Sequence, residues 1–341
     1  MNKIINVILS GGVGKRLWPL SRKDNPKQFI QIFNGKSLFQ HTLERNLKVA
    51  DDFLLVTNKS QLVLAEKQVQ ESNAELNHKI IEPVGRNTAP AIALAALSVS
   101  KDTILFITPS DHMIGDFEEY QKSVSEAVKL AKENYIVTFG IKPSKPETGY
   151  GYIEHQGNDV ISFREKPNKS TAEDFLAKGT FLWNSGMFCF KASTFLDELK
   201  KIQPEMYALC LVAYNNSSNG KIKLKDMEAI PDDSIDYAIL EKTNRIKMVK
   251  SNFNWSDLGS FDSLIDFSNN SKKYNLFEPI ITNIENNNSF AFTTKKVFST
   301  KNLKDIILIE TEDSILLLEK GESEIIKEVH TVVTEKYNEL T

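Results

Sequence analysis

The alternation of short apolar runs with amphipathic segments is the feature that most limits how this chain can fold. It extends over the first two thirds of the 341 residues. Such a succession is typical of α/β proteins, in which helices cover a mostly parallel sheet. We expect strands at 4–9, 53–57, 79–82, 103–108 and 135–140, and helices at 38–48, 61–71, 89–98 and 117–132.

The pattern changes after Gly149, where strand-like runs follow one another more closely. These runs are GYGYIEH, VISFREKP and FLWNSGMFCF. We interpret them as an inserted layer that faces a substrate, with a helix at 171–177 among them. Helices are expected again at 192–214 and 234–241, before a loop that carries NFNWSDLGS. The predicted fold class is therefore α/β with a Rossmann-like, mixed but mostly parallel sheet.

A smaller terminal unit is predicted after a segment at 269–288 that is rich in Asn, Ser and Lys and is typical of a linker. We therefore expect one domain at 1–268 and a second at 269–341. Strands are expected at 289–294, 306–310 and 314–318, and a closing helix at 323–335. That helix has one apolar side, which indicates a packing face and consists of Ile325, Ile326, Val329, Val332 and Val333.

Composition excludes several classes of protein. The 42 basic and 45 acidic residues leave a net charge of −3, which lacks the strongly basic field of a dedicated nucleic-acid binder. The two cysteines have no ligand spacing, which argues against a disulfide framework or a structural zinc site. The apolar run at the amino terminus stops at glycines and is too short for a signal or a membrane span. We expect a cytoplasmic protein that binds neither nucleic acid nor membrane.

The segment SGGVGKRLWPLSRKDNPKQF, directly after the first expected strand, has the chemistry of a phosphate cradle. Gly11, Gly12 and Gly14 let backbone amides close around an anion. Arg16 and Lys27 supply side-chain charge for a polyphosphate, and two prolines restrict the loop between them. A simple tight turn between a strand and a helix is the structural alternative.

Two familiar phosphate-binding loops are excluded by spacing. A Walker loop needs GxxxxGK[ST], but Leu9 stands at the first glycine and Arg16 replaces the Ser or Thr. A dinucleotide fingerprint that begins at Gly12 needs glycine or alanine where this chain has Leu17.

The chain resembles the sugar-nucleotide pyrophosphorylases, and among them the mannose-1-phosphate guanylyltransferases. The matches are GGVGKRLWPLSR, PKQF, EPVGRNTAPAI, TPSDH, GYGYIE, FREKP, NSGMF and NWSDLGS, and they occur in order across most of the chain. The resemblance implies a nucleotidyltransferase fold of the GT-A-like type. It also implies a small C-terminal β-helix-like domain that helps to form a homodimer.

The resemblance implies a role for individual residues. Arg16 and Lys27 stabilise the α-phosphate as pyrophosphate departs, and Lys166 holds the sugar phosphate. The nucleotide contacts are Gly11, Gly12, Gly14, Lys15, Glu82, Arg86, Asn87 and Ser110, and the sugar contacts are Gly149, Glu165 and Asn184. Structural readings of the same residues stay open: an exposed ion pair for Glu165 and Lys166, a turn for NSG, and a helix start at Asn87 or Thr88.

Two aspartates are candidates for a metal site. Asp111 follows the apolar run TILFITP, and Asp257 lies far downstream in a loop; each alone would suit a cap or a turn. Mg²⁺ commonly uses one or two carboxylates together with substrate phosphates, and the resemblance implies that these two bind it. The five histidines form no cluster, so a covalent or zinc mechanism has little support.

The reaction that the resemblance implies is condensation of GTP with α-D-mannose 1-phosphate to give GDP-mannose and pyrophosphate. A sugar phosphate is already ionised at neutral pH, so its attack on the α-phosphorus needs no general base. Another sugar 1-phosphate, such as that of a heptose or fucose, and a non-catalytic paralogue that binds nucleotide sugars are the alternatives. The residues alone do not select guanine. Only 73 residues follow residue 268, too few for a fused isomerase domain, so we expect one activity.

Overall fold

The structure of the chain, a computed structural model, describes residues 2–270, 274, 289–293 and 303–341. Contacts between residues divide it into two compact units. Unit 1 comprises 1–11, 43–110 and 116–254, and unit 2 comprises 12–42, 111–115 and 255–341. Each unit is therefore assembled from segments that are far apart in the sequence. The domain boundary expected between residues 268 and 269 stays a prediction.

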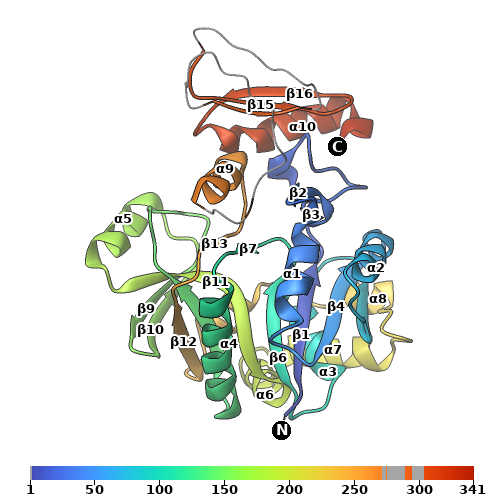
Figure 1. The fold of residues 1–341 in the computed structure, drawn as a ribbon. Coiled ribbons are helices and arrows are strands. Elements are labelled where there is room, and N and C mark those ends of the chain that lie inside the picture. Colours follow the sequence, from blue (N-terminus) through green and yellow to red (C-terminus); the bar gives the residue numbers. More distant parts are fainter. Residues whose placement is uncertain (1, 271–273, 275–288, 294–302) are drawn as a thin grey trace. The chain divides into compact units, whose positions relative to one another are not determined.

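In the described part of the chain, unit 1 is built on a nine-stranded sheet (Figure 1). Across the sheet the strands are β5 (His78–Glu82), β4 (Asp52–Asn58), β1 (Ile4–Ser10), β6 (Ile104–Pro109), β11 (Phe181–Lys191), β8 (Ile136–Ile141), β12 (Ile246–Ser251), β10 (Asp159–Arg164) and β9 (Tyr152–Gln156). The first four are parallel, whereas β11 is antiparallel to both of its neighbours. This confirms an α/β fold with a mixed sheet, and the five strands expected up to residue 140 agree to within one residue at each end.

Helices cover the sheet, so its central strands are almost wholly buried. The helices of unit 1 are α2 (Leu62–Glu71), α3 (Thr88–Leu97), α4 (Phe117–Lys132), α5 (Lys169–Lys178), α6 (Ala192–Ile202), α7 (Pro204–Asn215) and α8 (Leu224–Ala229). The residues of α1 (Leu38–Asn46) are divided between the two units. Helix α3 is apolar on all sides and packs against β1, β4, α6 and α7. Helix α4 is amphipathic and packs against β8, β11 and β12.

Two of the expected helices differ from the structure. The helix expected at 192–214 is two helices, because Pro204 begins α7 and a proline cannot donate the hydrogen bond that would continue α6. The helix expected at 234–241 is a π-helical turn, η3 (Asp236–Leu240). Such wide turns are frequent at functional sites.

Unit 2 contains short strands around its own apolar core. The described strands are β2 (Gln31–Phe33), β3 (Lys36–Ser37), β7 (Met113–Ile114), β13 (Trp255–Ser256), β14 (Phe290–Phe292), β15 (Ile306–Glu310) and β16 (Ile315–Glu319). β15 pairs with β14 in parallel and with β16 antiparallel. The small C-terminal sheet is therefore present. Most of the linker expected at 269–288 lies outside the described residues, and its first two residues end helix α9 (Phe261–Asn270).

The closing helix is η4 (Ser323–Ile325) followed by α10 (Ile326–Lys336). Ile326 is buried in the core of unit 2, and Val329 and Val333 pack against that core. Ile325 and Val332 are about half exposed. The packing face is thus narrower than expected, because residues 326, 329 and 333 recur on one helical stripe and the other two flank it.

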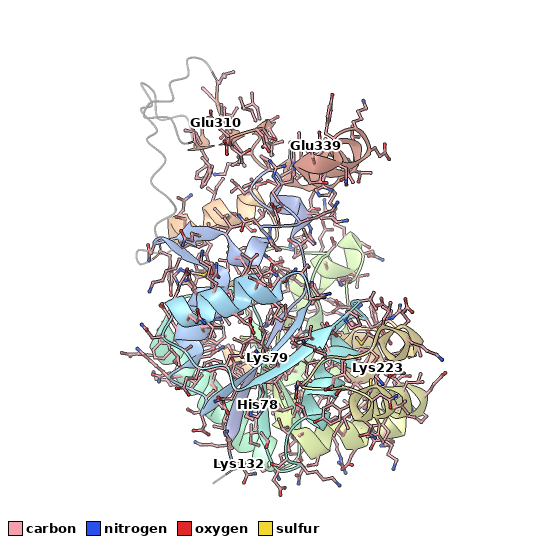
Figure 2. The ribbon with its side chains drawn as sticks, turned by 90° about the vertical axis from the view of Figure 1, so that its right-hand side faces the viewer. His78, Lys79, Lys132, Lys223, Glu310 and Glu339 are labelled. Carbon is pink, nitrogen blue, oxygen red and sulfur yellow. The ribbon has the colours of Figure 1, made fainter. Side chains whose placement is uncertain are left out.

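The outer strand β5 begins with the polar residues His78 and Lys79 (Figure 2). Lys79 Nζ pairs with Glu66 at 2.7 Å, and His78 Nε2 lies 3.5 Å from Asp52. Charged side chains on an edge strand oppose pairing with another chain.

Cys189 and Cys210 are both buried, and neither forms a disulfide. The cytoplasmic location stays a prediction. Among the described helices, none has the length and apolarity needed to span a membrane.

Candidate functional site

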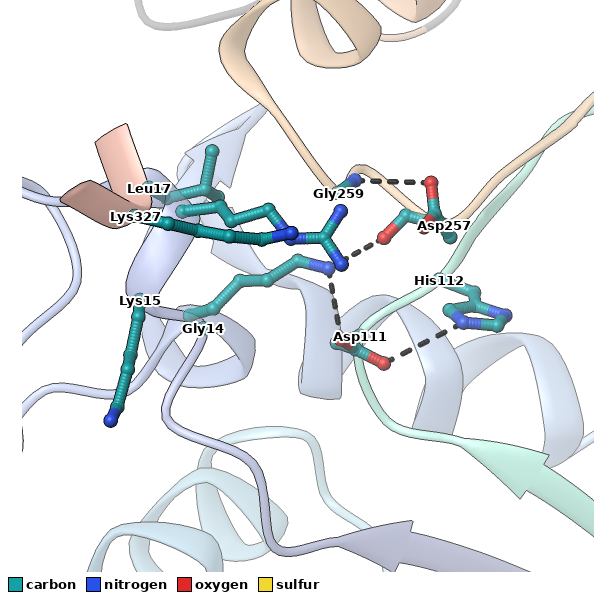
Figure 3. A pocket seen from close by; sticks show the side chains of 10 residues that line it. Gly14, Lys15, Leu17, Asp111, His112, Asp257, Gly259 and Lys327 are labelled. Atoms are coloured by element: carbon teal, nitrogen blue, oxygen red, sulfur yellow. Dashed lines mark hydrogen bonds and ion pairs between the residues drawn. The ribbon is translucent and has the colours of Figure 1, made fainter. Parts of the chain in front are cut away.

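A pocket of about 400 Å³ in unit 2 collects most of the predicted phosphate and metal residues (Figure 3). Its lining comes from the loop after β1, the segment after β6, the loop after β13, and α10. The lining residues are Gly14, Lys15, Arg16, Leu17, Lys27, Asp111, His112, Asp257, Gly259 and Lys327. The structure therefore brings Lys15, Arg16 and Lys27 together with both predicted acids, from three distant parts of the sequence.

The buried ammonium of Lys27 joins the two acidic segments. Lys27 is only 5% exposed, and its Nζ donates to Asp111 Oδ2 at 2.8 Å and to the main-chain oxygen of Asp257 at 2.5 Å. A buried charge is stable only with such partners. Burial alone would raise the pKa of Asp111, but the Lys27 ammonium and His112 outweigh it and hold that pKa below its ordinary value.

Two glycines allow the close approaches inside this pocket. Gly14 has a φ of +77°, and a Cβ there would lie 2.3 Å from the Cβ of Lys27. A Cβ at Gly259 would lie 2.7 Å from Asp257 Oδ2 and 3.1 Å from Arg16 Nη1. Gly11 and Gly12 have no atom within 4 Å of a built Cβ, so space for a ligand, not packing, is what these two glycines offer.

The two cations before Leu17 point differently. Leu17 is fully buried and anchors the turn η1 (Lys15–Leu17) in the core of unit 2. Arg16 Nη1 lies 3.7 Å from Glu324 Oε1, whereas the Lys15 side chain points away from Asp111 and Asp257 (Figure 3). Glu324 and Lys327 were not predicted as site residues, because nothing in the local pattern of the closing helix indicates a ligand.

The predicted sugar residues lie in unit 1. Lys166 Nζ pairs with Glu165 Oε1 at 3.1 Å, and Lys166 itself has a left-handed φ of +45°, a strained conformation that is common at ligand sites. Gly151 lets Glu165 approach Asn184, since a Cβ on Gly151 would lie 2.5 Å from Glu165 Oε2 and 3.3 Å from Asn184 Cβ. Gly149 donates its N–H to Glu147 Oε1 at 3.2 Å.

Asp236, at the start of the π-helical turn, joins this sugar cluster and was not predicted. It accepts a hydrogen bond from Asn184 Nδ2 at 3.0 Å, while Asn184 Oδ1 accepts one from Thr138 Oγ1 at 2.8 Å. Burial, and then the charge of Glu165, raise the pKa of Asp236 to about 7. Perturbed carboxyls of this kind cluster at functional sites. Only the tertiary fold reveals Asp236, because its sequence neighbours read as an ordinary helix.

The predicted nucleotide residues of unit 1 have different surroundings. Glu82, at the end of β5, is buried, and its Oε1 has no hydrogen-bond partner among the described residues; burial raises its pKa to about 7. Arg86 instead donates to the main-chain oxygens of Met227 and Glu228 in α8. Asn87 caps α3 by accepting from Thr88 N at 3.0 Å, so the helix start is confirmed. Ser110 is buried at the end of β6.

The unit 2 pocket contains both acids that are predicted to bind a metal. Among the described residues, no group of three or more His, Cys, Asp or Glu side chains is placed to hold a metal. Asp111 and Asp257 nevertheless line one pocket, and carboxylate oxygens are the ligands that Mg²⁺ prefers. An ion held by two carboxylates keeps its other positions for substrate phosphates and water.

We predict that Gly14→Ala destabilises the protein by about 2 kcal/mol, since alanine would be strained at this φ and would press on Lys27. Gly12→Ala is the matched control, because its new Cβ meets no atom, and its change should stay within about 0.5 kcal/mol. Urea unfolding of both variants measures the difference. Equal stabilities for the two would contradict the packing assigned to Gly14.

A family model described as nucleotidyl transferase matches residues 5–273. The chain is 38% identical to a mannose-1-phosphate guanylyltransferase of Salmonella muenchen, over 96% of this chain and 73% of that protein. It is also 38% identical to the alginate biosynthesis protein AlgA of Pseudomonas aeruginosa, over 96% of this chain and 71% of that protein.

Solved structures similar to this one include two proteins named for mannose phosphates. A Thermus thermophilus protein described as a mannose-1-phosphate geranyltransferase superposes with a TM-score of 0.81 at 27% identity, covering 98% of this chain and 99% of that one. A Helicobacter pylori protein described as a mannose-6-phosphate isomerase has a TM-score of 0.69 at 38% identity, covering 74% of this chain and 99% of that one.

Proposed function

The chain belongs to the nucleotidyl transferase family, and from this premise we propose that it transfers GMP from GTP to α-D-mannose 1-phosphate, giving GDP-mannose and pyrophosphate. Relatives that carry the name mannose-1-phosphate guanylyltransferase over nearly the whole chain support this reaction. The observation that carries the proposal is the buried Lys27, which holds Asp111 and Asp257 in one pocket with Arg16.

Charge stabilisation is the chemistry that this pocket supplies. Arg16 and Lys27 offset the negative charge that develops on the α-phosphorus and on the departing pyrophosphate. An oxygen of the sugar phosphate forms a new bond to the α-phosphorus. At the same time, the bond between the α-phosphorus and the oxygen that bridges it to the β-phosphate breaks, and pyrophosphate leaves with that oxygen. The nucleophile is already ionised, so no residue has to remove a proton.

Asp111 and Asp257 would hold Mg²⁺, because both line the unit 2 pocket and carboxylate oxygens are ligands that this ion prefers. When bound, the ion supplies a further positive charge beside the phosphates. Lys27 orients this pair, because it binds the Asp111 side chain and the Asp257 main chain at once.

The sugar phosphate is assigned to Lys166, and the sugar hydroxyls to Glu165, Asn184 and Gly149. Asn184 is held in one orientation by Thr138 and Asp236, so a hydroxyl in the wrong position would leave polar groups unpaired. We assign Asp236 to the same cluster as a positioning residue for Asn184. A heptose or fucose 1-phosphate would have to satisfy the same groups.

Glu82 favours guanine as the base. Guanine presents its N1–H and its amino group side by side as donors, and a carboxylate accepts both. Adenine presents an acceptor at N1, which would leave the carboxylate opposed by a lone pair. The unpartnered and buried Oε1 of Glu82 is an acceptor of the kind required.

A homodimer with a β-helix-like C-terminal domain completes the proposal. Among the described residues, β16 leaves Ile315 and Leu317 strongly exposed. Exposed apolar side chains on one strand face are typical of contact surfaces.

The function is tested by measuring pyrophosphate release from each of four nucleoside triphosphates with a panel of sugar 1-phosphates. GTP with mannose 1-phosphate should give the highest kcat/KM. Preference for a heptose or fucose 1-phosphate would change the substrate, and no release from any pair would favour the non-catalytic alternative. Conversion of mannose 6-phosphate alone would favour the isomerase name of the Helicobacter structure.

In that assay, Arg16→Ala and Asp111→Ala should each lower kcat by at least about a hundredfold, the scale for one group that stabilises the transition state. Lys67→Ala, on the exposed face of α2, is the control and should leave kcat unchanged. A variant of Arg16 or Asp111 that turns over like the wild type would refute the role assigned to that residue.

Glu82→Gln should lower the preference for GTP over ATP by about tenfold or more and should remove part of the pH dependence of GTP binding. Below a pKa of about 7, the Glu82 carboxyl is protonated, so binding as a carboxylate must release a proton. Wild-type affinity relative to the variant should therefore fall as pH decreases from 8 to 6, by up to about tenfold per unit. A constant ratio would exclude Glu82 from the base site.

Ile315→Lys combined with Leu317→Lys should convert the dimer to a monomer, because charge on β16 would have to be buried in the contact. Light scattering measures the mass of both proteins. A monomeric wild type would reject the homodimer itself.

A further inference from the structure

We propose that Lys327, on α10, is a further binding residue for the pyrophosphate group. We also propose that Glu324 forms ion pairs with Lys327 and Arg16 until a polyphosphate binds these two cations in its place. This inference rests on the proposed function, because it takes the unit 2 pocket as the site of the triphosphate. It assigns the C-terminal helix to the substrate site as well as to the fold.

Lys327 reaches the pocket from a segment far downstream of the other cations. It lines the same cavity as Arg16, Lys27 and the two aspartates, and its side chain runs into that cavity beside Leu17 (Figure 3). Its neighbour Ile326 is fully buried in the core of unit 2 together with Leu17. The backbone that presents Lys327 is thus anchored in the same core as the glycine-rich loop.

Further contacts fix the segment after α10 to the glycine-rich loop. Trp18 Nε1 donates to the main-chain oxygen of Leu340 at 2.7 Å, and Lys23 Nζ donates to Asn338 Oδ1 at 2.9 Å. Arg22 also donates to the Leu340 oxygen. Ile326 packs into the core at the start of α10, and these contacts hold the segment after its end. Lys327 therefore needs only side-chain motion to meet an anion.

Glu324 stands between the two cations that would change partners. Its Oε1 lies 3.7 Å from Arg16 Nη1, and its Oε2 lies 3.3 Å from Lys327 Nζ. All three side chains are more than 40% exposed, and exposed pairs of this kind contribute little stability. Phosphate oxygens make stronger, charge-assisted hydrogen bonds with the same groups.

Lys27 differs from Arg16 and Lys327 in its burial and in its hydrogen-bond partners. Its ammonium is buried and already bound to Asp111 and Asp257, so it cannot turn fully to a ligand without leaving an acid unpaired. Among the described residues, the ion pairs of Arg16 and Lys327 are with Glu324, which is itself exposed. The pocket lining holds four basic side chains and two aspartates, and this excess of positive charge suits a polyphosphate better than a single phosphate.

The test measures binding of inorganic pyrophosphate, with Mg²⁺ present, by titration calorimetry, and the KM for pyrophosphate in the reverse reaction with GDP-mannose. Lys327→Met should lower the affinity for pyrophosphate and raise the KM for pyrophosphate, each by about tenfold, which is the scale of one charge-assisted hydrogen bond. The KM for GDP-mannose should stay within about twofold. Lys327→Arg should restore most of the loss, which a merely structural role would not predict.

Glu324→Gln should strengthen pyrophosphate binding by about threefold, because the two cations lose their competing partner. That gain should shrink when Lys327→Met is also present. Lys336→Met, an exposed lysine at the far end of the same helix, is the control for general loss of positive charge.

Wild-type pyrophosphate affinity in Lys327→Met, or an equal loss in Lys336→Met, would overturn the role of Lys327. Unchanged or weaker binding in Glu324→Gln would overturn that of Glu324. The proposed function and this inference can fail independently of each other. Binding that depends on Lys327 without turnover of mannose 1-phosphate would reject the function only, while normal turnover with unaltered pyrophosphate affinity in Lys327→Met would reject only this inference.

Discussion

The contact between the buried ammonium of Lys27, the carboxylate of Asp111 and the main-chain oxygen of Asp257 is the interaction on which the unit 2 pocket depends. It ties together three segments that are separated by more than eighty residues along the chain. Removing the ammonium would leave the Asp111 carboxylate without its principal partner, and such losses are costly in buried surroundings. Lys27 therefore arranges the acids of this pocket as well as adding positive charge to it.

Much of the fold could be predicted from the sequence, because strands buried on both faces and amphipathic helices leave strong periodic signals. Where the signal is carried by one residue, prediction failed. Pro204 divides a continuous apolar pattern into α6 and α7, and the wide turn at Asp236 has the same letters as an α-helix. The small C-terminal sheet was predicted, whereas its β-helix-like form stays a proposal.

Residues of the candidate site could be predicted where they stand in sequence motifs, but not where only the tertiary fold brings them close to the site. Arg16, Lys27, Asp111 and Asp257 stand in motifs with distinctive spacing, and all of them line one pocket. Gly151, Asp236, Glu324 and Lys327 were missed, because each acts through a close approach that only the tertiary fold creates. The second glycine of GYGYIE was the one signal available for Gly151. Likewise, the bonds of Arg86 to α8 could not be read from its own neighbours.

We propose above all that Asp111 and Asp257 hold one divalent cation beside the triphosphate. Anomalous diffraction from crystals grown with GTP and Mn²⁺, a stand-in for Mg²⁺ with similar oxygen ligands, locates that cation directly. We expect one manganese peak at about 2.1 Å from a carboxylate oxygen of each aspartate and from a phosphate oxygen. Bound GTP whose manganese touches neither aspartate would contradict the account.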